Sequence, residues 1–83
     1  MEHVMALSQL PVGGEARVVR LLSAGGIRRR LQDIGLIEGT RVECVQKSPA
    51  GDPVAYAIRG AVIALRREDA CKVLVQPCGL DSQ

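Results

Sequence analysis

Four side chains of this sequence could bind a soft metal ion, namely Cys44, Cys71, Cys78 and His3. Their spacing does not form the close pairs typical of a tetrahedral zinc site, since six residues separate Cys71 from Cys78. Cys44 falls on the inward side of an expected strand, where a thiol behaves as a small apolar side chain. We therefore predict no metal centre and no cofactor, and keep Fe(II) or Zn(II) contact through these four side chains as the alternative.

No catalytic set is indicated. The carboxylates are scattered, and the adjacent pair Glu68 and Asp69 would point about 100° apart on a helix. The glycines form neither a phosphate-binding loop nor a dinucleotide-binding motif. His3 has no nucleophile spaced to pair with it. We predict a protein that is not an enzyme.

A basic cluster is the clearest charge feature. Between residues 16 and 32 there are no acids and five arginines, at Arg17, Arg20, Arg28, Arg29 and Arg30. Such a surface attracts acidic protein or phosphate, although three consecutive arginines fan around a helix instead of sharing one face. A solvated surface, an acidic protein partner and nucleic acid all stay open. Nucleic acid is least favoured, because the one aromatic residue, Tyr56, cannot build a stacking platform.

Composition indicates one small globular domain. The chain has 83 residues, a formal net charge of +2, 47% hydrophobic residues and no Phe or Trp, so the core must be aliphatic. The longest stretch without charge is far shorter than the roughly 20 residues that a membrane span needs. Glu2 stands where a secretory signal would be basic, and an odd number of cysteines fits reduced thiols. We expect a cytoplasmic protein without membrane insertion.

Local patterns predict short strands and one helix. Strands are expected at residues 15–23, 41–47, 53–58, 61–65 and 73–75, and a short helical turn at 66–72. The helix is expected at 27–34, because Ile27, Leu31 and Ile34 form one apolar stripe. Gly35 stands where a left-handed residue ends a helix, and Leu36 can then pack back on Leu31.

These elements predict a mainly β protein, a small, partly open barrel of about five strands with one inserted helix. In the first strand, alternation predicts that Ala16, Val18 and Leu22 face inward. The expected organisation is an N-terminal tail at 1–5, a single domain at 6–76 and a C-terminal tail at 77–83. The sequence leaves self-association open.

An ordered set of short motifs extends across nearly the whole chain. They are Leu7-Ser8 with Leu10 and Gly13, Ala16-Arg17-Val18, Arg30-Leu31-x-Asp33-x-Gly35-Leu36, Gly39-Thr40, Gly51-Asp52-Pro53, Ile58-Arg59-Gly60 and Ala64-Leu65-Arg66. In this order and at these intervals the sequence resembles the FeoA family.

The resemblance implies an SH3-like barrel with an inserted helix. It also implies an accessory role in bacterial ferrous iron uptake, at the inner face of the membrane, beside the FeoB transporter and its cytoplasmic G domain. Similar SH3-like domains end the DtxR-type iron regulators, so a module of a metal-dependent regulator is the nearest alternative. A small soft-metal-binding or nucleic-acid-binding barrel is a further one.

For the partner-binding surface we hypothesise a helix that displays Arg28, Arg29 and Gln32 outward. Leu36 and Ile37 would end it with a partly exposed apolar edge. An apolar centre with a charged rim is typical of a protein-binding surface.

Overall fold

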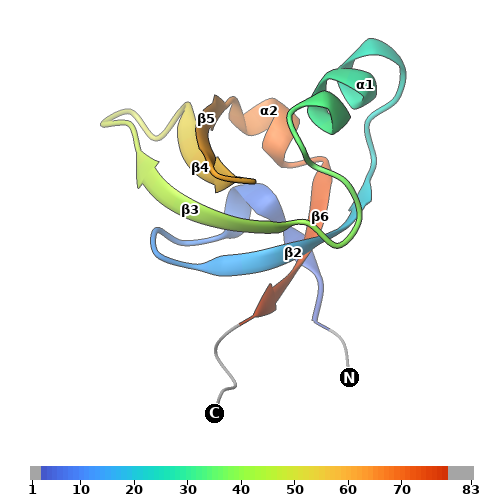
Figure 1. Ribbon diagram of the computed structural model, residues 1–83. Coiled ribbons are helices and arrows are strands. Elements are labelled where there is room, and N and C mark those ends of the chain that lie inside the picture. Colours follow the sequence, from blue (N-terminus) through green and yellow to red (C-terminus); the bar gives the residue numbers. More distant parts are fainter. Residues whose placement is uncertain (1–2, 79–83) are drawn as a thin grey trace.

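The computed structural model describes residues 3–78, which form a mainly β structure (Figure 1). The strands are β1 (Met5–Ala6), β2 (Glu15–Leu21), β3 (Arg41–Lys47), β4 (Val54–Ile58), β5 (Ala61–Leu65) and β6 (Val73–Cys78). The helices are a 3₁₀ turn η1 (Leu7–Gln9), α1 (Gly25–Asp33) and the short α2 (Arg67–Ala70). None of the helices in this range is long and apolar enough to cross a membrane.

The strands form one antiparallel sheet in the order β1-β6-β2-β3-β4-β5. The sheet curls, but its edge strands β1 and β5 do not pair with each other, so the barrel is partly open (Figure 1). This confirms the predicted fold class. The strand that the sequence analysis missed is β1, because two residues are too few to show an alternating pattern.

The core inside the curled sheet is aliphatic, as the composition predicts. Its fully buried members include Leu7, Ala16, Leu36, Val42, Cys44, Val73 and Val75. Tyr56 is also buried, and its hydroxyl donates a hydrogen bond to the carbonyl oxygen of Leu7 over 3.4 Å. A polar group therefore enters the core together with a partner, as burial of a hydroxyl requires.

One inward-facing residue of β2 was predicted wrongly. Leu21 is buried, whereas Leu22 is 53% exposed. The pairing of β2 with β6 shifts between Val18 and Arg20, which places a β-bulge at Val19. A bulge adds one residue to the strand and so reverses the alternation beyond it.

The C-terminal strand is longer than predicted. β6 continues past Val75 through Pro77 to Cys78, and Met5 belongs to β1, so these residues are not parts of tails. Beyond Val75, β6 pairs with β2 but not with β1, so one side of the strand forms no ladder hydrogen bonds there. Pro77, which has no N–H, is tolerated in such a stretch. The rest of the expected tails, residues 1–2 and 79–83, lies outside the described residues.

Helix α1 begins two residues earlier than predicted and ends at Asp33. Its first residues are Gly25 and Gly26, whose low helix propensity matters less in a first turn, where the N–H groups have no helical partner. At its end Gly35 has φ of +109°, and its N–H donates to the Gln32 carbonyl over 3.0 Å. The Leu36 N–H donates to the Leu31 carbonyl over 3.0 Å, which completes a Schellman motif.

The two hairpin connections are tight. The Gly51 N–H donates to the Ser48 carbonyl over 2.8 Å, as expected of the predicted turn at residues 48–51. Between β4 and β5, Arg59 and Gly60 both have positive φ, at 50° and 86°. Two such residues indicate a type I′ turn, although the sequence lacks the usual Asn or Asp.

We predict that Gly35→Ala lowers the free energy of unfolding by about 1–3 kcal/mol. A Cβ at residue 35 would lie 2.6 Å from Arg59 Cδ and 3.2 Å from Ile58 Cγ2, in a backbone conformation that L residues rarely adopt. Urea unfolding measures the change. Gly26→Ala is the matched control: a Cβ there meets nothing within 4 Å, so the variant gains about 0.4–1 kcal/mol. Equal effects of the two variants would contradict this account of Gly35.

We also predict a loss of stability in alkali. Burial, with a smaller contribution from Cys44, raises the pKa of Tyr56 to about 12, and burial raises the pKa of the Cys44 thiol. Both groups hold their protons more tightly in the folded state, so their contribution is complete below their ordinary pKa values of about 8.5 and 10. It is lost as the pH rises from there towards the folded-state values.

Urea unfolding at a series of pH values from 7 to 11 measures this loss. Tyr56→Phe removes the phenol and lowers the unfolding free energy by about 0.5–1.5 kcal/mol at pH 7 through loss of its hydrogen bond. It should also flatten the decline above about pH 10. A decline as steep as that of the parent protein would show that Tyr56 does not cause it.

Candidate functional site

A hollow of about 640 Å³ lies between α1 and β2, and it is the candidate protein-binding site. We call it the α1/β2 hollow. The residues around it that matter here are Arg28, Gln32, Ile37, Val4, Arg20 and Leu74. The first three belong to the predicted partner-binding set, so the fold brings these three together.

One polar contact fixes the helical side of this hollow. The Arg28 guanidinium donates from Nη1 to the carbonyl oxygen of Leu21 over 3.1 Å, which ties α1 to the end of β2. Gln32 lies one turn further along α1, on the same side as Arg28. The basic and amide side chains therefore form one wall of the hollow.

Backbone hydrogen bonds to β2 hold the segment that follows α1. The Gly39 N–H donates to the Val18 carbonyl over 2.8 Å, and the Val18 N–H donates to the Thr40 carbonyl over 2.9 Å. Arg17 Nη1 adds a hydrogen bond to the Gly39 carbonyl over 3.2 Å. This loop is thus docked on the sheet, which presents Ile37 at the surface with 44% exposure.

Two of the predicted partner-binding residues do not belong to the hollow. Leu36 has 0% exposure, so the prediction of a partly exposed edge there is wrong. The Schellman motif turns Leu36 inward towards Leu31, and the next residue, Ile37, then faces outward. Arg29 is exposed but does not line the hollow, because it lies about 100° around the helix from Arg28.

The hollow has an apolar centre and a polar rim. Val4 is 43% exposed and, with Ile37 and Leu74, supplies the apolar surface. Arg20 and Arg28 make the rim mainly basic, and Glu38 adds one carboxylate. This arrangement fits a protein surface that carries apolar and acidic side chains.

Val4 and Leu74 line the hollow but were not among the predicted partner-binding residues. They come from opposite ends of the chain and reach β2 only because β6 pairs with it. The only available signal was the apolar character of each residue, which does not distinguish a surface site from the core. Arg20 could have been assigned as a neighbour of α1 from its place at the end of β2.

The predicted soft ligands are spread over the molecule. Cys44 is fully buried, Cys71 is exposed beside α2 with its Sγ 3.3 Å from the Glu68 carbonyl oxygen, and Cys78 is half-buried on β6. Within residues 3–78, no group of three or more His, Cys, Asp or Glu side chains is arranged to hold a metal ion. The described structure thus does not gather the four side chains into one site, and Fe(II) or Zn(II) contact through Cys71 and Cys78, with His3 or Cys44, stays an alternative.

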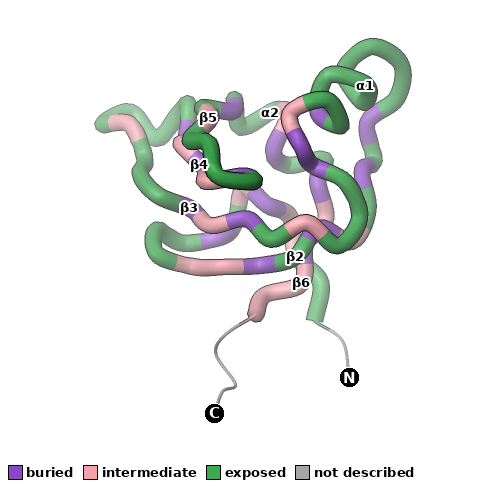
Figure 2. Tube along the Cα trace, viewed as in Figure 1, coloured by how far each residue is buried: buried purple, intermediate pink, exposed green. Residues whose placement is uncertain are grey.

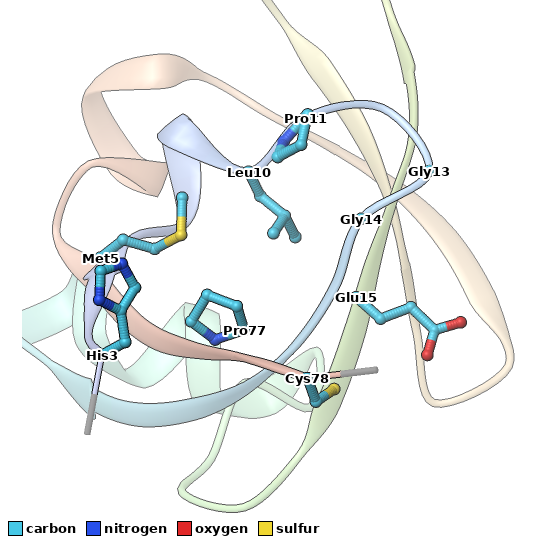
Figure 3. Close-up of a pocket in the computed structure, with 9 residues that line it drawn as sticks. All are labelled: His3, Met5, Leu10, Pro11, Gly13, Gly14, Glu15, Pro77 and Cys78. Atoms are coloured by element: carbon cyan, nitrogen blue, oxygen red, sulfur yellow. The ribbon is translucent and has the colours of Figure 1, made fainter. Parts of the chain in front are cut away.

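His3 and Cys78 do share a second hollow, of about 510 Å³, near the ends of the described chain (Figure 3). Met5, Leu10 and Pro77 line it as well. Figure 3 shows Leu10 and Pro77 pointing into this hollow. Its lining is mainly apolar, and we assign no chemistry to it.

A family model described as FeoA domain matches residues 5–77. A protein of Porphyromonas gingivalis (strain ATCC BAA-308 / W83), the Fe(2+) transport protein A/Fe(2+) transporter FeoB fusion protein, is 40% identical over 72 residues. The match covers 87% of this chain and 8% of that protein, so the chain spans only a small part of this relative.

Solved structures agree with the fold. The FeoA protein from Chlorobium tepidum superposes with a TM-score of 0.87 at 32% identity, over 94% of this chain and 74% of that one. Stenotrophomonas maltophilia FeoA complexed with zinc, described as a procaryotic SH3 domain protein, has a TM-score of 0.73 at 37% identity, over 86% of this chain and 88% of that one. The predicted SH3-like fold is confirmed.

A manganese-dependent transcriptional repressor shares this fold at 19% identity, with a TM-score of 0.82 over 94% of this chain and 44% of its own. At that identity the likeness concerns the fold alone.

Leu36 is buried in the core and its neighbour Ile37 lies at the surface, and this difference is testable. We predict that Leu36→Ala lowers the free energy of unfolding by about 2–5 kcal/mol, because it leaves a cavity in the core. Ile37→Ser should change it by no more than about 0.5 kcal/mol, since the side chain is partly exposed. Urea unfolding of both variants measures the difference. Comparable losses would contradict the assignment of Ile37 to the surface.

Proposed function

Because this chain belongs to the FeoA family, whose members are accessory proteins of ferrous iron transport, we propose that it binds a FeoB-type ferrous iron transporter. It would act in the cytoplasm, at the inner face of the membrane, and without catalysis of its own. The α1/β2 hollow would receive the cytoplasmic G-domain region of the transporter. Ferrous iron is then the transporter's substrate, and this chain needs no bond to it.

The match to a FeoA–FeoB fusion protein carries this proposal. In that relative a segment 40% identical to this chain belongs to the same polypeptide as the transporter. Covalent fusion keeps two domains together at high effective concentration, which favours pairs of domains that act together. The same association is therefore the best-supported function for the separate chain.

The surface properties fit such an association. The chain is basic, with a pI near 8.6, and the rim around Ile37 is mainly basic as well. An acidic partner surface would be attracted over a distance and would then bury the apolar centre. Binding would change the transporter only if the hollow prefers one of its conformations over another.

We predict that Ile37→Ser and Arg28→Glu each weaken binding to the intact transporter by about tenfold or more. Ile37→Ser removes the apolar centre, and Arg28→Glu reverses a charge in the wall of the hollow. The measurement is biolayer interferometry with the FeoB-type transporter of the same organism in nanodiscs. Arg29→Glu makes the same charge change outside the hollow and serves as the matched control.

Two results would overturn parts of the proposal. If all three variants bind as tightly as the parent protein, the α1/β2 hollow is not the contact surface. If the parent protein shows no binding to the transporter and instead binds DNA or RNA with a steep dependence on salt, the nucleic-acid alternative replaces it.

A further inference from the structure

Strand β5 is an edge of the sheet that no other strand in residues 3–78 covers. Its inner side pairs with β4, from Ile58 opposite Ala61 to Val54 opposite Leu65. The pair that closes a two-residue hairpin is hydrogen-bonded, and hydrogen-bonded and non-bonded pairs alternate along an antiparallel ladder. Val62 and Ala64 therefore direct their N–H and C=O groups away from β4.

These four outward groups have no hydrogen-bond partner within residues 3–78. The hydrogen bonds that residues 3–78 form outside the sheet ladders do not involve Val62 or Ala64. Val62 is 65% exposed, and much of the β5 tube is drawn as exposed in Figure 2. The strand thus offers two residues in the geometry that an added strand requires.

This edge also lacks the usual protection against strand addition. Charged side chains, proline or a bulge normally interrupt an exposed edge. The residues of β5 are all apolar, and the pairing of β4 with β5 runs through all five without a shift. The edge is therefore open to a partner strand along its whole length.

A hollow of about 400 Å³ lies beside β5, between it, α1 and α2. Ile27 and Leu31 line it from α1, Ile34 from the residue after α1, and Ile63 from β5. Because side chains alternate along a strand, every second side chain of an added strand would enter this hollow, where these four apolar residues lie. The hollow uses a different face of α1 from Arg28 and Gln32, so it is separate from the α1/β2 hollow.

The charged side chains around β5 determine which kind of strand can pair with this edge. Arg59 precedes β5 and Arg66 follows it, both are exposed, and neither forms an ion pair within the described residues. Glu68 and Asp69 lie beyond Arg66 at the α2 end of the hollow, and Arg30 lies on its α1 side. The two residues that directly flank β5 are thus basic, while Asp52, which accepts a hydrogen bond from the Arg67 N–H over 2.9 Å, adds a third carboxylate beyond Arg66.

Charge disfavours a second copy of the chain in the register centred on Ile63. Antiparallel self-pairing centred on Ile63 would place Arg59 of one copy opposite Arg67 of the other at both ends of the pair. Like charges directly opposite each other destabilise a strand pair. A strand with carboxylates at its ends would instead meet Arg59 and Arg66.

We propose that the outer edge of β5 binds an extended segment of another protein as an added strand. That segment carries apolar side chains at alternate central positions, which enter the hollow beside α1, and acidic residues at its two ends. This second binding face goes beyond the proposed function, since it uses neither the α1/β2 hollow nor its residues.

Two capped synthetic peptides, EVTVTVE and KVTVTVK, test the proposal against the full chain by fluorescence anisotropy. The acid-flanked peptide should bind at least about tenfold more tightly than the lysine-flanked one, which corresponds to about 1.4 kcal/mol. Arg66→Glu should reduce or reverse this preference. Failure of the acid-flanked peptide to bind at millimolar protein concentration would overturn the proposal.

A matched pair of variants at Val62 tests the backbone hydrogen bonds between β5 and the added strand. Val62→Pro removes an outward N–H at an edge position where proline is tolerated, and it should abolish peptide binding. Val62→Thr keeps the N–H and should retain it. Urea unfolding checks that both variants fold; if Val62→Pro does not, a peptide N-methylated at alternate residues blocks the same hydrogen bonds from the other side.

If the acid-flanked peptide still binds folded Val62→Pro, or if its N-methylated form still binds the parent protein, no strand is added at this edge. Either result would overturn the proposal. Analytical ultracentrifugation gives a further outcome. A dimer of the parent protein that Val62→Thr keeps and Val62→Pro or Arg66→Glu abolishes would identify a second copy as the occupant of this edge, against the proposal.

Discussion

The end of helix α1 is the constraint on which the rest of the surface depends. Gly35 adopts a backbone conformation reserved for glycine, and the side chain of Arg59 fills the space where a Cβ would stand. This turn sends Leu36 into the core and leaves Ile37 at the surface. The α1/β2 hollow uses Ile37, whose direction follows from this turn. One position without a side chain thus separates a core residue from a residue of the candidate binding face.

Most of the local structure could be predicted because its causes are local. Alternation along residues 41–44 and the glycine after the helix depend on neighbours in the sequence, and both are found as expected. The errors arise where pairing between distant strands decides. The bulge at Val19 is imposed by the register of β2 against β6, and it exposes Leu22 in place of Leu21. Short β1 exists only because β6 offers it a partner.

The candidate site could be predicted in part for the same reason. Arg28, Gln32 and Ile37 lie on or just after one helix, so helical geometry alone places them near one another. Leu36 was misassigned because its exposure depends on the direction in which the chain leaves the helix. Val4 and Leu74 complete the apolar centre, but they are about 70 positions apart in the sequence and meet only through the sheet. Neither they nor the open edge of β5 has a signature within a short stretch of sequence.

The course of β6 along β2 governs how this domain can be joined to other polypeptides. Cys78 pairs with Glu15 at the beginning of β2, whereas Val73 pairs with Leu21 at the other end, just before the chain enters α1. The six residues of β6 place its two ends five steps apart, a distance of about 17 Å. A domain continuing beyond Cys78 would leave from the side remote from the helix (Figure 1). It would be tethered without masking either face of α1, so both faces could still engage a target in cis.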